Sequence, residues 1–139
     1  MSIKESKEAV RRYYEFFNRK EFDKCDQLIA PGFVSHRTTG EVLKENMKKG
    51  IEMLFLAFPD LHASIEFVIA EGDMVSFREV ATGTHTGDFM GIPPTGKPFK
   101  MINACTLRVH NGKWAEAWTN IDDLNMLQQL GVIQPLGQK

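Results

Sequence analysis

The chain has 139 residues, of which 42% are hydrophobic and 25% are charged, as in an ordinary globular domain. Its 17 basic and 18 acidic residues give a formal net charge of −1, which excludes the strongly basic character of proteins that bind nucleic acids or anionic membranes. The longest apolar run, Met53–Phe58, is far shorter than the about 20 residues of a membrane-spanning helix, and the charged N-terminus lacks the apolar core of a signal peptide. Cys25 and Cys105 stand in no metal or redox spacing, which predicts two reduced thiols. We therefore expect one soluble, cytoplasmic domain over residues 1–139.

Helical spacing of apolar residues dominates the first half of the chain. Ser2 and Glu5 have the spacing of a capping box and predict a helix at the N-terminus. The residues expected on its buried face are Val10, Tyr13, Tyr14 and Phe17. A short second helix is expected over residues 22–29, because Pro31 and Gly32 follow it.

A second capping box, formed by Thr38 and Glu41, predicts a longer third helix. Its apolar stripe consists of Leu43, Met47, Ile51, Leu54 and Phe58. Pro59 ends this helix, and the hydrophobic period then changes from helical to two. A half-buried strand is expected over residues 63–69, and its buried side consists of Ala63, Ile65, Phe67 and Ile69.

Hairpins fill the second half of the chain. A further strand is expected over residues 74–84, and Asn111–Gly112 tolerates the positive φ of a type I′ turn that joins strands over 100–110 and 113–121. The last segment, 123–130, predicts a helix. Helices that are segregated from consecutive hairpins indicate an α+β fold. We expect N-terminal helices packed on a strongly curved antiparallel sheet, forming a cone with an internal pocket.

The loop His85–Phe99 is rich in glycine and proline and is long for a connection between two neighbouring strands. Such a loop often forms a lid or the rim of a pocket. It can equally be a compact loop that only covers one end of the sheet. The residues alone leave both interpretations open.

Sequence motifs for metal, nucleophilic and nucleotide chemistry are absent, so we expect no metal site. Polar residues that face inward are the remaining candidates. In the strand over 100–110, alternation places Asn103 and Cys105 on the buried side with Leu107 and Val109. A buried amide requires hydrogen-bond partners, so Asn103 either binds a loop backbone or faces a polar cavity.

The last strand offers a second set of polar candidates. Its alternation places four residues on one face: Glu116, Trp118, Asn120 and Asp122. A tryptophan among polar residues is typical of the wall of a binding pocket, although the same face can be exposed or buried in a dimer. Asp122 also stands directly before the predicted last helix, and from the residues alone the role of an N-cap is favoured for it.

Four motifs distributed over nearly the whole chain resemble one family. They are Phe33–His36, Ala57–Leu61, the run GTHTGDFMGIPPTG at Gly83–Gly96, and the segment from NGKWAEAW to LQQLG at Asn111–Gly131. Together they resemble the SnoaL-like polyketide cyclases of the nuclear transport factor 2-like superfamily. The fold implied by this resemblance is the cone described above.

The resemblance also implies a chemistry: the intramolecular aldol ring closure of an aromatic polyketide ester, without metal or cofactor. Asp122 matches the aspartate that acts as general acid/base, and His85 matches the histidine of the Gly-Thr-His-Thr-Gly motif at the pocket rim. The cyclases carry a pocket histidine at the position that matches Cys105. Cys105 therefore departs from the family pattern, because a thiol cannot replace imidazole as the partner of an enolate.

Three functional hypotheses follow. The first is a cofactor-independent cyclase or isomerase that uses Asp122 on a small or medium apolar carbonyl compound. The second is a ligand-binding module without turnover, and the third is a protein that dimerises through its sheet. The side chains expected to bind the small molecule are Tyr14, Phe17, His36, Met47, Asn103, Cys105, Glu116 and Trp118.

The composition of the outer sheet face predicts a homodimer. The helices cover only one face of the sheet, so the other face is left without a covering layer. This outer face is expected to carry Val80, Thr82, Ile102, Ala104 and Thr106. This surface is too apolar for comfortable exposure to water. We expect no nucleic-acid or membrane partner.

Overall fold

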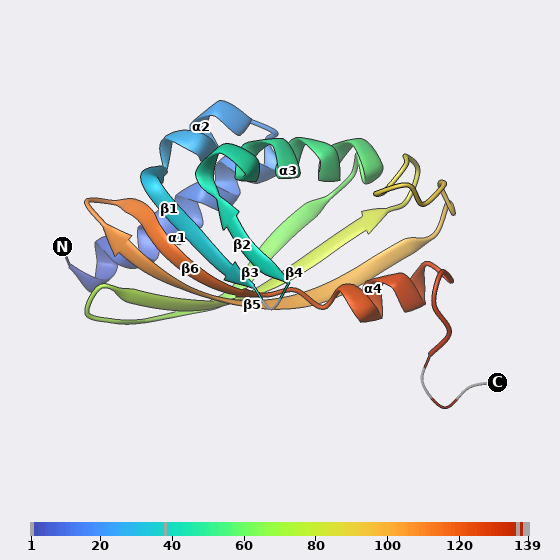
Figure 1. The fold of residues 1–139 in the computed structure, drawn as a ribbon. Helices are drawn as coiled ribbons and strands as arrows, with labels where there is room; N and C mark the ends of the chain where they lie inside the picture. The colour runs from blue at the N-terminus through green and yellow to red at the C-terminus, as the bar shows by residue number, and fades with distance from the viewer. Residues whose placement is uncertain (1, 38, 136, 138–139) are drawn as a thin grey trace.

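Three helices lie over one face of a curved sheet in the computed structural model, which describes residues 2–37, 39–135 and 137 (Figure 1). They are α1 (Ile3–Asn18), α2 (Phe22–Gln27) and α3 (Lys44–Ala57), and a further helix, α4 (Asp123–Gln129), contacts β5. The strands are β1 (Ile29–Arg37), β2 (Gly40–Leu43), β3 (His62–Glu71), β4 (Met74–Thr84), β5 (Pro98–His110) and β6 (Lys113–Asn120).

The strands form one six-stranded sheet in the order β2-β1-β6-β5-β4-β3. Neighbouring strands are antiparallel except β1 and β6, which are parallel. The parallel pair arises because the chain enters the sheet at β1 and returns beside it only with its last strand. The predicted α+β fold, with helices on a curved and unclosed sheet, is confirmed.

The first helix is anchored at both ends. The Ser2 hydroxyl accepts a hydrogen bond from the Glu5 N–H at 3.2 Å, which confirms the predicted cap. At the other end, the Asn18 amide donates to the Ala63 carbonyl and accepts from the Ala63 N–H, both at 2.8 Å. Between these ends, the Tyr13 ring stacks on Trp114 with centroids 4.1 Å apart. These contacts place the aromatic face of α1 against the inner face of the sheet.

Two helix boundaries differ from the sequence prediction. The second helix ends at Gln27, and Pro31–Gly32 lies inside β1, where the register towards β6 shifts between Ile29 and Val34. The predicted capping box does not start α3. Thr38 lies outside the described residues, and Glu41 pairs with His36 in the β1–β2 hairpin. Antiparallel pairing with β1 therefore overrides the local capping signal.

The buried side of β3 also differs from the prediction. A β-bulge between Ile65 and Phe67 adds one residue to β3 relative to β4. One extra residue moves the following side chains to the other face of a sheet. As a result Val68 is buried, whereas Phe67 and Ile69 are 49% and 62% exposed on the outer face.

Candidate functional site

The inner face of β5 carries the predicted polar residues. Asn103 and Cys105 are buried on the same face as Leu107 and Val109, as alternation predicts. This face lies beneath α1 and α3 (Figure 1). The polar groups of β5 are therefore enclosed between the sheet and the helices.

Asn103 connects two carboxyl-bearing residues. Its Oδ1 accepts a hydrogen bond from the Asp122 backbone N–H at 3.0 Å. Asn103 also lies opposite Glu79 on β4, and its side chain lowers the pKa of the Glu79 carboxyl. The predicted need of this buried amide for partners is thus met by the backbone after β6 and by a carboxyl group inside the fold.

Glu79 is a candidate site residue that the sequence analysis missed. It faces inward between Phe77 and Ala81, and the Tyr14 hydroxyl donates a hydrogen bond to its Oε2 at 3.3 Å. Loss of hydration raises the pKa of the Glu79 carboxyl, and the hydrogen bonds from Tyr14 and Asn103 oppose that rise. The signal was present in the sequence, because alternation along β4 places a carboxyl among apolar inward positions.

Cys105 lies in a small network of hydroxyl groups. Its Sγ is 3.6 Å from Thr119 Oγ1, which is 2.9 Å from Ser35 Oγ. Burial raises the pKa of the Cys105 thiol to about 12. The thiol therefore stays protonated at neutral pH and is a weak hydrogen-bonding group rather than a nucleophile.

Asp122 caps α4, as the residues alone favour. Its Oδ1 accepts a hydrogen bond from the Asn125 N–H at 3.3 Å, and its side chain is exposed. The next residue, Asp123, has a carboxyl whose pKa is raised, mainly because the group is partly desolvated. The positive charge of Arg37 opposes this rise, and the negative charge of Asp122 adds to it. The end of β6 thus presents two adjacent carboxyl groups near a guanidinium group.

The predicted placement of His36, Glu116 and Trp118 in the pocket is wrong. Trp114 lies opposite Val109, whereas Glu116 lies opposite the neighbouring residue Arg108, so β6 has one extra residue, a β-bulge, at this point. The side chains of β6 that follow the bulge therefore point to the opposite face from the one that simple alternation predicts. The inward positions of β6 are instead Trp114, Ala117 and Thr119.

On the outer face, His36 and Glu116 form a pair across β1 and β6. His36 Nε2 is 2.7 Å from Glu116 Oε2, and this contact lowers the pKa of the Glu116 carboxyl. The His36 ring lies 5.6 Å from that of Trp118, which is 36% exposed. These three predicted residues are brought together, but on the opposite side of the sheet from Asn103.

His85 is not at a pocket rim. Its side chain is 0% exposed and packs against Phe58, with ring centroids 5.5 Å apart. Its Nδ1 accepts a hydrogen bond from the Thr95 N–H at 3.2 Å, and its backbone bonds Lys97 and Gly96 across the base of the loop. In this arrangement His85 holds the loop 85–99 together.

The remaining predicted residues lie near α1 and α3. Phe17 is buried, and its ring is 5.5 Å from that of Tyr14 and 5.1 Å from that of Phe55. Met47 borders a narrow crevice with Cys25 and Ile29. Phe17 therefore adjoins the Tyr14–Glu79 pair, whereas Met47 belongs to the packing between α2, α3 and β1.

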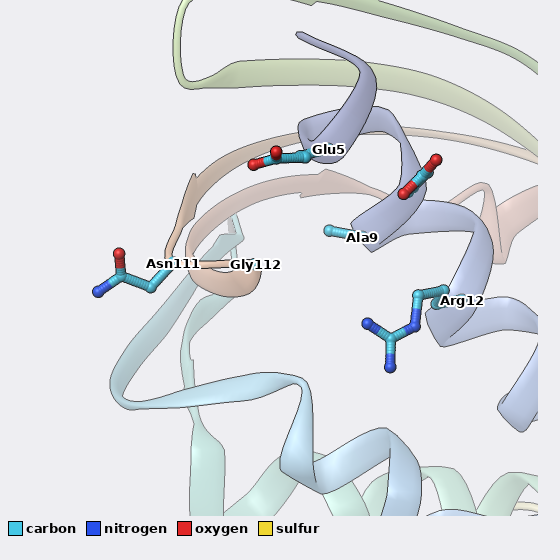
Figure 2. A pocket seen from close by; sticks show the side chains of 6 residues that line it. Glu5, Ala9, Arg12, Asn111 and Gly112 are labelled. Carbon is cyan, nitrogen blue, oxygen red and sulfur yellow. The ribbon is translucent and has the colours of Figure 1, made fainter. Parts of the chain in front are cut away.

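The structure also has a surface pocket of about 410 Å³, which lies between the start of α1 and the β5–β6 turn (Figure 2). It is lined by Glu5, Glu8, Ala9, Arg12, Asn111 and Gly112. Because this turn precedes β6 and Asp122 follows it, the pocket is at the opposite end of that strand from the candidate site.

Within the part of the chain that the structure describes, no group of three or more His, Cys, Asp or Glu side chains is arranged to hold a metal ion. Among the same residues, no helix has the length and apolar character needed to cross a membrane.

Comparisons with known proteins agree with the fold and the motifs. The profile of the SnoaL-like polyketide cyclase family matches residues 7–130. No curated protein matches the chain. The chain belongs to the SnoaL-like polyketide cyclase family, whose members adopt a nuclear transport factor 2-like fold.

Solved structures give the same assignment. AclR, a proposed hydroxylase from Streptomyces galilaeus, is 31% identical with a TM-score of 0.89, over 99% of this chain and 87% of AclR. IdmH, a proposed polyketide cyclase from Streptomyces antibioticus, is 34% identical with a TM-score of 0.80, over 91% of this chain and 99% of IdmH. A proposed SnoaL-like polyketide cyclase from a Jannaschia species is 25% identical with a TM-score of 0.84, over 97% and 98% of the two chains.

Proposed function

We propose that the protein is a cofactor-independent enzyme of the cyclase or isomerase type, in which Asp122 exchanges a proton at the carbon next to a carbonyl group. Its substrate is a small or medium apolar carbonyl compound. The observation that carries this proposal is the position of Asp122, whose backbone is held from the inner sheet face by Asn103 while its carboxyl group remains exposed.

The chemistry requires a carboxylate that is ionised and fixed in place. An Asp122 carboxylate takes the α-proton, and the electron pair left on carbon moves into the carbonyl group to give an enol or enolate. This carbon then attacks a second carbonyl in a cyclase, or takes back a proton at another position in an isomerase. Membership of the SnoaL-like family supports the first outcome, and AclR shows that proteins proposed to have other activities share this fold.

A test of Asp122 does not require the natural substrate. We choose 2-tetralone, an apolar ketone with exchangeable α-protons, and measure their replacement by deuterium in D₂O by NMR. The wild type is expected to accelerate exchange, and Asp122→Asn is expected to lose about a hundredfold or more of that acceleration, because an amide cannot accept the proton. Asp73→Asn, at the β3–β4 turn, is the matched control and should behave as the wild type.

The free energy of unfolding of Asp122 variants separates the acid/base role of this residue from its role as the N-cap of α4. Asparagine caps a helix about as well as aspartate, so Asp122→Asn should keep the free energy of unfolding within a few tenths of a kcal/mol, whereas Asp122→Ala should lose about 1 kcal/mol. Full exchange activity in Asp122→Asn would reject the acid/base role. It would then favour the alternative, a small-ligand-binding module of the same fold, which the replacement of the cyclase histidine by Cys105 supports.

A further inference from the structure

We propose that Glu79 is the second proton-transferring group of this site: together with Tyr14 it binds the carbonyl oxygen of the substrate, and it protonates that oxygen while Asp122 removes the α-proton. This inference rests on the proposed function, and it assigns to the site a proton donor that the family motifs quoted above do not contain.

The geometry places Glu79 and Tyr14 at one point inside the fold. The Tyr14 hydroxyl donates to Glu79 Oε2 at 3.3 Å, which brings a hydroxyl from α1 and a carboxyl from β4 together. Around them the inward positions are apolar and buried, as Phe77, Ala81 and Met101 are. Glu79 and Tyr14 themselves are half-buried.

Asn103 links this pair to Asp122. The Asn103 side chain lies opposite Glu79 on the neighbouring strand, acts on the Glu79 carboxyl, and accepts from the Asp122 N–H at 3.0 Å. Both carboxyl-bearing residues are thus held by the same side chain, one from the inner sheet face and the other from the end of β6. In the proposed complex the substrate lies across Asn103 and reaches both carboxyl groups.

The two carboxyl groups have different environments. Asp122 is exposed and accepts a backbone N–H, whereas Glu79 is largely removed from water, which raises the pKa of its carboxyl. The titratable groups that act on Glu79 or feel its charge are Tyr13 and Tyr14 of α1 and Cys105 of β5, all of which are neutral at neutral pH. A carboxyl whose pKa is raised by burial is suited to donate a proton in such a site.

The proton balance of the step is complete without a co-reactant. The Asp122 carboxylate gains the α-proton as the C–H bond breaks, and the electron pair forms the C=C bond of an enol. The carbonyl oxygen gains the proton of the Glu79 carboxyl, which becomes a carboxylate beside the Tyr14 hydroxyl. Return of the carbon-bound proton from Asp122 and of the enol proton to Glu79 restores both groups. The substrate class is therefore an enolisable ketone or ester with an apolar body.

The test combines a titration with the 2-tetralone exchange assay on the full chain. Carbon-13 NMR of glutamate side-chain carboxyls, with Glu79→Gln to assign the signal, is expected to show that Glu79 titrates above the ordinary glutamate pKa. Glu79→Gln is expected to slow the exchange about a hundredfold and Tyr14→Phe about tenfold. Glu71→Gln, an exposed glutamate at the β3–β4 turn, is the matched control and should leave the exchange unchanged.

The outcomes separate this inference from the proposed function. A Glu79 that ionises at or below the ordinary glutamate pKa, or a Glu79→Gln variant that exchanges as fast as the wild type, overturns the inference, whereas loss in Asp122→Asn still supports the base. Loss of exchange in Glu79→Gln with full activity in Asp122→Asn rejects Asp122 as the base, and with it both the proposed function and the pairing of the two acids. A purely structural role of Glu79 would lower stability without changing the pH profile of the exchange, and that result also overturns the inference.

Discussion

Asn103 and Asp122 are 19 positions apart in sequence, yet the Asn103 Oδ1 accepts a hydrogen bond from the Asp122 N–H at 3.0 Å. This contact ties the end of β6 to the inner face of β5, directly before α4 begins. It fixes the backbone from which the Asp122 carboxyl projects. The orientation of the proposed base therefore depends on a buried amide of another strand.

Asn103→Ala is expected to lower the free energy of unfolding by about 1–3 kcal/mol, because it leaves the Asp122 N–H without its acceptor. Urea denaturation measures this loss. Asn46→Ala, at an exposed position of α3, is the control and should change stability by less than about 0.5 kcal/mol. Equal stability of the two variants would contradict a supporting role for Asn103.

The raised pKa of Glu79 predicts a pH dependence of stability. Between the ordinary glutamate value of 4.5 and the raised pKa of the folded state, the folded protein binds more protons than the unfolded chain. The stabilisation by Glu79 is therefore fully present below 4.5 and is lost as the pH rises through the folded-state pKa. Urea denaturation across this range should show the wild type losing stability relative to Glu79→Gln, and parallel curves would contradict the prediction.

Local signals predicted the parts of the site that depend on nearby residues. The Ser2 cap of α1 and the Asp122 cap of α4 each involve residues three positions apart, so sequence spacing was sufficient. The inward positions of Asn103 and Cys105 followed from alternation in a strand without a bulge before them. The same alternation along β4 places Glu79 on the inner face with Phe77 and Ala81.

Two β-bulges explain what the sequence could not predict. After a β-bulge, the side chains of a strand point to the opposite face from the one that simple alternation predicts. Where a bulge occurs depends on how the strand pairs with its neighbour. The bulge opposite Arg108 moved Glu116 and Trp118 to the outer face, and the bulge after Ile65 did the same to Phe67. The pair of His36 and Glu116, 80 positions apart, depends on the parallel pairing of β1 with β6, which no local pattern signals.

The loop 85–99 is held against the end of α3 at Gly87. The N–H groups of Thr86 and Gly87 both donate to the Ala57 carbonyl, and a Cβ at Gly87 would lie 2.1 Å from the Leu56 carbonyl oxygen. Gly87→Ala is therefore expected to displace the loop and to lower the free energy of unfolding by about 1–3 kcal/mol.

Thermal unfolding monitored by circular dichroism measures the effect of Gly87→Ala. Gly32→Ala is the matched control, since a Cβ at Gly32 meets no atom within 4 Å and its φ is not positive. If the two variants melt at the same temperature, the close approach of Gly87 to α3 does not constrain the loop.

The outer face of the sheet predicts self-association. Phe67 and Ile69 of β3, Ile102 of β5 and Trp118 of β6 all point away from the helices and are 36% to 62% exposed. The residues expected on this face from the sequence, among them Ile102 and Ala104, lie there as predicted. Exposed apolar side chains on one sheet face are typical of an interface, and a second copy of the chain would cover them with the same residues.

We expect the wild type to sediment as a homodimer of 15.8 kDa chains at micromolar concentration. Ile102→Glu is expected to give a monomer with an unchanged circular dichroism spectrum, because it places a charge in the centre of the apolar face, where desolvating it opposes association. Ile3→Glu, at a position of α1 that is 50% exposed, is the matched control and should remain dimeric. A monomeric wild type, or a dimer that Ile102→Glu does not dissociate, would show that the sheet face is not the interface.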